Sequence, residues 1–138
     1  MSMHIGVSIL LSLWAYQKAA NLFYPFMIIL GGNFIDLDHF VDYFIFFKNR
    51  FKLKEFLRGA YLRSGKVYLL LHSWEMGFVL FLLSLSLGSR PLMLFSLSLS
   101  LHLAIDNAQR KNPLVYFLIY RFSKGFDALV LFPELIDD

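Results

Sequence analysis

Residues 22–47 read LFYPFMIILGGNFIDLDHFVDYFIFF, and this apolar stretch decides the expected fold. It exceeds the roughly 20 residues that a helix needs to cross a bilayer. The tripeptide Gly31-Gly32-Asn33 interrupts the stretch and predicts a break, after which Asn33 caps a new helix. Three ionisable residues follow at once, namely Asp36, Asp38 and His39. Because broken helices in membranes usually line a site, we expect a polar centre here.

The composition favours a membrane as the main solvent of the chain. Hydrophobic residues occupy 58% of the 138 positions and charged residues 17%, whereas soluble domains have roughly 45–50% and 25%. Residues 67–87 and 91–108 also reach spanning length, and a first helix is expected over residues 3–18. These patterns predict an all-α integral membrane bundle of about four transmembrane helices, the second broken at residues 31–33, in a single domain over residues 1–138.

Basic residues predict the orientation. Residues 48–66 carry seven lysines and arginines and one acid, Glu55, and such an excess marks a cytoplasmic loop. Four spans then leave both termini cytoplasmic, in a multi-pass protein of the cell membrane. Aromatic side chains among the basic ones predict a short interfacial segment that binds anionic headgroups, with a plain positive-inside anchor as the alternative. Residues 110–138 are expected to form an interfacial segment and a solvated tail.

Ionisable residues interrupt the apolar segments, and they include all four histidines of the chain. Residues three or four positions apart share a helix face. This spacing pairs Asp36 with His39, His72 with Glu75, and His102 with Asp106, while His4 opens the first helix. At about 1.5 Å of rise per residue, these groups fall in one layer of the cytoplasmic half of the membrane. Because the chain has no cysteine, a metal ion there would be held by nitrogen and oxygen atoms. A metal-free polar network is the alternative.

The order of these residues resembles the LexA-binding, inner membrane-associated hydrolases, also described as membrane-bound metal-dependent hydrolases. The likeness covers roughly residues 3–109. Residues 35–39, IDLDH, are similar to the family's Pro-Asp-hydrophobic-Asp-His motif, and His102 with Asp106 to its late His-x-x-x-Asp motif. Residues 71–73, LHS, are similar to the end of its His-Arg-x-x-Thr-His-Ser motif. Ile35 replaces the proline, and Val67-Tyr68 stand in place of the His-Arg pair.

The resemblance implies a hydrolase with one or two divalent ions per chain, zinc foremost and manganese or iron as alternatives. The ligand candidates are His4, Asp36, Asp38, His39, His72, Glu75, His102 and Asp106. Glu75 is either a ligand or the general base, and Asp38 is the second catalytic candidate. An intramembrane site would favour a lipid or a lipid-linked phosphoester or ester as substrate.

Other classes of function use the same features. A divalent-metal transporter or sensor needs the same ligands, and a noncatalytic membrane scaffold or regulator would use the basic loop to recruit a cytoplasmic protein. The expected partners are membrane lipids, a lipid-like substrate, a second copy of the chain and such a cytoplasmic protein. No direct contact with nucleic acid is expected.

Overall fold

The computed structural model describes residues 2–48, 51–57, 62 and 65–133, and the regular elements in these ranges are helices. The all-α part of the prediction is therefore confirmed. The chain forms two compact units, each described below by itself. The first unit contains residues 1–35 and 74–106, and the second contains residues 36–73 and 107–138. The single domain expected from the sequence stays a prediction.

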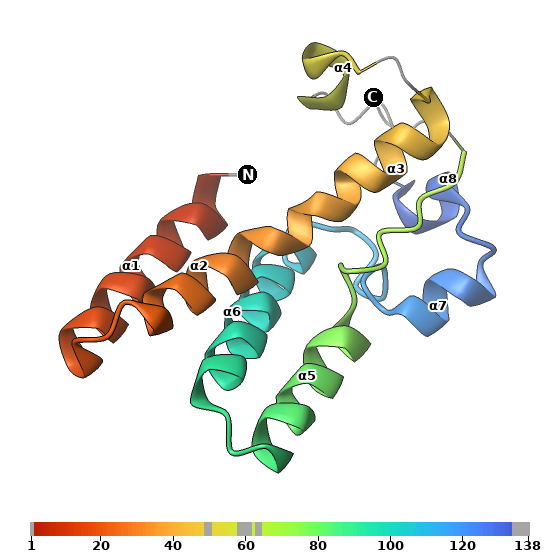
Figure 1. Ribbon diagram of the computed structural model, residues 1–138. Coiled ribbons are helices and arrows are strands. Elements are labelled where there is room, and N and C mark those ends of the chain that lie inside the picture. The colour runs from red at the N-terminus through yellow and green to blue at the C-terminus, as the bar shows by residue number, and fades with distance from the viewer. Residues whose placement is uncertain (1, 49–50, 58–61, 63–64, 134–138) are drawn as a thin grey trace. The chain divides into compact units, whose positions relative to one another are not determined.

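The first unit contains α1 (Ser2–Ala19), α2 (Phe23–Asn33), α5 (Trp74–Ser86) and α6 (Arg90–Asn107) (Figure 1). The last residue of α6 is assigned to the second unit. Helices α1 and α2 pack side by side, as their red and orange ribbons show. Small serines occupy the helix contacts, where the Ser98 hydroxyl donates to the Ile28 carbonyl at 2.7 Å and Ser12 donates to the Pro25 carbonyl at 3.2 Å. Both hydrogen bonds join neighbouring helices of the first unit through small side chains.

Gly31 and Gly32 do not break the helix, contrary to the sequence-based prediction. Both lie inside α2, which runs on to Asn33 before the 3-10 turn η1 (Phe34–Asp36). A Cβ at Gly31 would overlap the Phe95 carbonyl oxygen, and one at Gly32 would overlap the Ser8 hydroxyl. The two glycines therefore allow close approach of neighbouring helices. Asn33 does not cap α3, because its side chain donates to the carbonyl of Ile29 at 2.8 Å.

The second unit contains α3 (Leu37–Phe47), α4 (Leu53–Leu57), α7 (Leu118–Ser123) and α8 (Ala128–Leu131). Aromatic rings from α3 and from residues 51–56 pack against one another. Phe40 stacks on Phe56 with ring centroids 4.2 Å apart, and Tyr43 meets Phe51 edge to face at 5.5 Å. The Tyr43 side chain is fully buried in this cluster. Lys66, the last residue of the predicted basic loop, pairs with Asp127 in an isolated antiparallel bridge.

Residues 67–73, called the His72 loop below, are not helical, although the sequence predicts a helix over residues 67–87. Helix α5 begins only at Trp74. The backbone N–H groups of the loop donate to the carboxylates of Asp42 and Asp38, and Arg121 donates to two of its carbonyls. Because side chains satisfy these backbone groups, the loop needs no helical hydrogen bonds.

The predicted membrane architecture is wrong. Within residues 2–48, 51–57, 62 and 65–133, no helix combines the length and the apolar character that crossing a bilayer requires. Helices α2, α3 and α5 have 11, 11 and 13 residues, and α1 and α6 reach 18 residues but are not apolar enough. This finding contradicts both the four-span bundle and the multi-pass inner-membrane localisation.

Substituting Gly31→Ala should lower the free energy of unfolding by about 1–3 kcal/mol, because the new methyl group meets backbone atoms of Phe95 that cannot rotate away. The matched control is Gly6→Ala in α1, where a Cβ meets nothing within 4 Å. This control should be neutral or stabilising by up to about 1 kcal/mol. Denaturant unfolding of both variants checks the prediction, and equal stability of the two would contradict it.

Candidate metal centre

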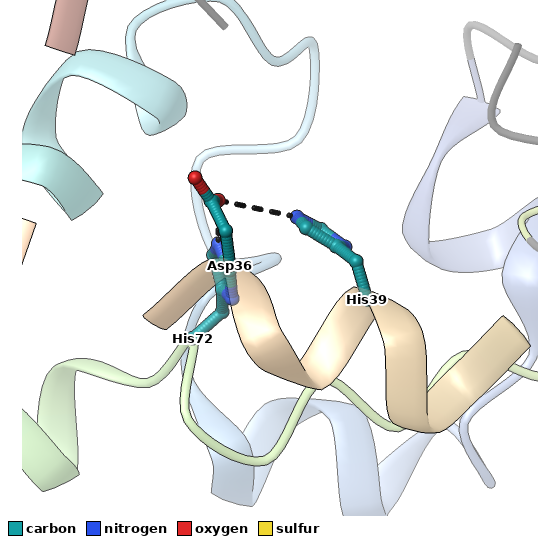
Figure 2. Close-up of side chains that lie close together, drawn as sticks. All are labelled: Asp36, His39 and His72. Carbon is teal, nitrogen blue, oxygen red and sulfur yellow. Dashed lines mark ion pairs between the residues drawn. The ribbon is translucent and has the colours of Figure 1, made fainter. Parts of the chain in front are cut away.

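Asp36, His39 and His72 form a group of potential metal ligands inside the second unit (Figure 2). Each offers one ligand atom, and these atoms lie within 4.8 Å of one another. The Asp36 Oδ1 atom is 3.7 Å from His39 Nε2 and 3.6 Å from His72 Nε2. Asp36 ends η1 and His39 lies one turn later in α3, whereas His72 comes from the His72 loop. We call these three residues the ligand cluster.

Asp38 orients the imidazole of His72. Its Oδ1 atom lies 2.7 Å from His72 Nδ1, and its Oδ2 atom accepts from the backbone N–H groups of Leu71 at 2.8 Å and His72 at 3.0 Å. The carboxylate accepts a hydrogen bond from the Nδ1–H group, so the ring turns its Nε2 atom toward Asp36. Carboxylates hold metal-binding histidines in this way in many proteins. The contacts of Asp38 are thus those of a positioning residue, and its predicted roles as ligand and catalytic group stay predictions.

Two more side chains fix the loop that carries His72. The Asp42 Oδ2 atom accepts from the N–H groups of Tyr68 at 2.8 Å and Leu69 at 3.1 Å. From α7, Arg121 donates to the carbonyls of Leu69 at 2.7 Å and His72 at 2.8 Å. Asp42 is 1% exposed and Arg121 is fully buried. Since hydrogen bonds to charged groups are worth about 1.5–3 kcal/mol, this arrangement holds the loop firmly.

The charges around His72 favour its protonated form when no ion is bound. Burial alone would lower the pKa of the imidazole, but the carboxylates of Asp36 and Asp38 outweigh burial and raise the pKa to about 9. Burial raises the pKa of Asp42 to about 6, against the lowering effect of its two backbone N–H donors. A cation beside Asp36 can therefore take over the positive charge that the proton supplies at His72.

In the first unit, His102 and Asp106 share a face of α6, as their spacing predicts. The His102 Nε2 atom is 3.2 Å from Asp106 Oδ2, and its Nδ1 atom is 2.6 Å from the carbonyl oxygen of Gly32. A carbonyl only accepts, so Nδ1 carries a proton and Nε2 faces the carboxylate. This pair supplies two of the predicted ligands.

Two predicted ligands, Glu75 and His4, remain. Glu75 is half-buried in the first turn of α5, but His72 precedes that helix. The expectation that these two residues share one helix face is therefore wrong, because the bonds of the His72 loop delay the start of the helix. His4 lies in α1, and its side chain is outside the described residues.

Sequence reasoning missed the roles of Asp42 and Arg121. Asp42 lies one turn after Asp38, so the two carboxylates share a face of α3, and this spacing is a signal that was open to use. Nothing in the sequence near Arg121 indicates that its guanidinium reaches a loop some 50 residues earlier.

No family model, curated protein or solved structure matches this chain. The resemblance to the membrane-bound metal-dependent hydrolases therefore stays a prediction.

The donor set of the ligand cluster fits a divalent transition-metal ion. Two imidazole nitrogens and one carboxylate oxygen suit zinc, manganese or iron. His72 is fully buried while the side chains of Asp36 and His39 are 29% and 20% exposed, so an ion can enter from the side of these two residues. The coarser prediction, that buried histidine and aspartate groups can hold a metal ion, is confirmed.

The stability of the metal-free protein should fall as the pH rises from 6.5 through about 9. Protonated His72 stabilises the folded state, because its folded pKa of about 9 exceeds the ordinary 6.5. The contribution is complete below pH 6.5, is lost above about pH 9, and is worth about 3 kcal/mol. Asp42, with a pKa of about 6, is largely ionised throughout this window.

Thermal unfolding in the presence of a chelator, at several pH values between 6.5 and 9.5, measures this effect. The His72→Gln variant keeps a polar side chain and loses the titrating group, so its curve should be flatter. Parallel curves for the wild type and this variant would contradict the assignment.

Proposed function

We propose that the protein binds a divalent metal ion through Asp36, His39 and His72 and uses it to hydrolyse an ester or phosphoester bond. One observation carries the proposal: the three ligand atoms lie within 4.8 Å of one another, while Asp38 directs Nε2 of His72 toward Asp36. Orientation of a ligand by a carboxylate distinguishes a metal centre from a chance meeting of polar groups.

Among the residues that the structure describes, the ligand cluster offers three ligand atoms, and this number favours catalysis over a purely structural ion. Structural zinc sites are closed by four protein ligands, whereas catalytic sites use three and leave a position for water or substrate. An ion held by Asp36, His39 and His72 would supply the chemistry of such sites, in which the metal acidifies a water molecule and polarises the oxygen of a scissile bond. Asp38 orients His72, and the partial exposure of Asp36 and His39 would let a substrate approach the ion.

The proposal is restricted to esters and phosphoesters in general. The lipid substrate expected from the sequence depended on a site buried in a bilayer, and that architecture is contradicted. Hydrolysis itself follows from the family resemblance together with the donor set. The general-base role of Glu75 stays a prediction from the sequence, because Glu75 belongs to the first unit and the ligand cluster to the second.

The purified protein should bind zinc or cobalt at the ligand cluster. Asp36→Asn and His39→Ala should each weaken binding more than about 100-fold, which exceeds the loss usually caused by changes outside the ligands. Glu55→Gln is the matched control, since Glu55 is a carboxylate in α4 that pairs with Lys52 at 2.9 Å. Elemental analysis after gel filtration, with chelator competition, measures stoichiometry and affinity. Equal metal content in Asp36→Asn and Glu55→Gln would refute the ligand assignment.

The zinc- or manganese-loaded protein should cleave simple chromogenic esters or phosphoesters, such as p-nitrophenyl acetate and bis-p-nitrophenyl phosphate. Cleavage should stop in Asp36→Asn and in the chelated wild type, because both lack the bound ion, and should continue in Glu55→Gln. Metal binding without cleavage of either ester class, at several pH values, would leave a binding protein and reject the hydrolase.

A further inference from the structure

Arg121 is a fully buried cation that contacts the backbone of the His72 loop. Its Nη1 atom donates to the Leu69 carbonyl at 2.7 Å, and its Nη2 atom donates to the carbonyl of His72 itself at 2.8 Å. Both atoms of the guanidinium fork thus hold the loop at points three residues apart. A fork of two parallel donors fixes orientation as well as distance.

The same loop is held from its other side by α3. Asp38 and Asp42 accept from four of its N–H groups. At both Leu69 and His72, the N–H group donates to a carboxylate and the C=O group accepts from Arg121. The main chain at His72 therefore has little freedom to rotate, and the direction of its imidazole depends on both partners.

We propose that Arg121 is a positioning residue of the metal centre, which holds His72 so that Nε2 faces Asp36. This inference rests on the proposed metal binding. Arg121 donates to main-chain oxygens and acts through His72, so it is not a ligand. Its place in α7 makes the C-terminal part of the second unit necessary for a site whose ligands all lie in residues 36–72.

Arginine is better suited to this position than lysine. A lysine ammonium is a single point of donation at the end of a flexible chain, so it reaches one carbonyl at a time. Arg121→Lys keeps the positive charge near Asp42 and loses the two-point hold. Arg121→Met removes both the charge and the donors while keeping a long side chain. The two variants therefore separate the geometry of the fork from its charge.

The experiment compares wild type, Arg121→Lys, Arg121→Met and the control Lys124→Met, an exposed basic residue just after α7. Zinc affinity is measured by competition with a chromophoric chelator, and folding by circular dichroism. We expect affinity to fall about 10–100-fold in Arg121→Met, as for other residues that orient ligands. Arg121→Lys should fall between this variant and wild type, and Lys124→Met should match wild type.

A second readout needs no metal. The Nδ1 proton of His72, bonded to Asp38, and that of His102, bonded to the Gly32 carbonyl, are each followed by NMR in the metal-free proteins. In the Arg121 variants the His72 resonance should shift while that of His102 stays. A purely structural role would move both resonances or neither.

The outcomes separate the two proposals. Wild type that binds no zinc refutes the proposed function, and the His72 resonance still decides whether Arg121 positions that ring. Wild-type affinity and an unmoved His72 resonance in folded Arg121→Met overturn the inference while leaving metal binding intact. If neither Arg121 variant folds, the residue serves the fold as a whole, and the positioning role is rejected.

Discussion

The bond between the Asp38 carboxylate and the His72 imidazole is the interaction on which the candidate site depends. It joins α3 to a loop more than 30 residues later and selects which nitrogen of His72 faces Asp36. The same carboxylate accepts two backbone N–H groups, so one side chain fixes both the ring and its main chain. Without this bond, a buried imidazole could turn away from the other two ligands. The arrangement of the candidate metal centre is in this sense a consequence of how α3 holds the His72 loop.

Satisfaction of backbone groups explains why the loop exists. Leu69 has a left-handed backbone, with φ of 44°, and a non-glycine residue holds that conformation only when its surroundings compensate for the strain. Asp42 and Arg121 bond Leu69 on its N–H and C=O sides, which supplies that compensation. Asp38 stabilises the loop and also raises the pKa of His72, so the conformation of the loop and the affinity of His72 for protons have one origin.

Much of the local structure could be predicted from the sequence, and the long-range structure could not. The apolar sequence predicted a helix over residues 3–18, close to the observed α1, and residue spacing paired Asp36 with His39 and His102 with Asp106. The apolar sequence of residues 67–73 predicted a helix, and this prediction was wrong. Hydrogen bonds from Asp42 and Arg121, which are distant in sequence, override helix propensity there. Gly31 was misjudged for a similar reason, since its close neighbour Phe95 lies far away in sequence. The predicted membrane architecture depended on the same apolar segments. It was wrong because no helix in the described part of the chain is long and apolar enough to cross a bilayer.

The central claim is that one ion is held by two imidazoles and one carboxylate of the second unit. X-ray absorption at the zinc edge of the zinc-loaded protein tests it most directly, because the outer-shell scattering of imidazole rings counts the histidines on the metal. The account predicts two imidazoles with the remaining ligands oxygen, at about 2.0–2.1 Å for nitrogen, and one imidazole in His39→Ala. An oxygen-only shell, or an unchanged spectrum in His39→Ala, would contradict it.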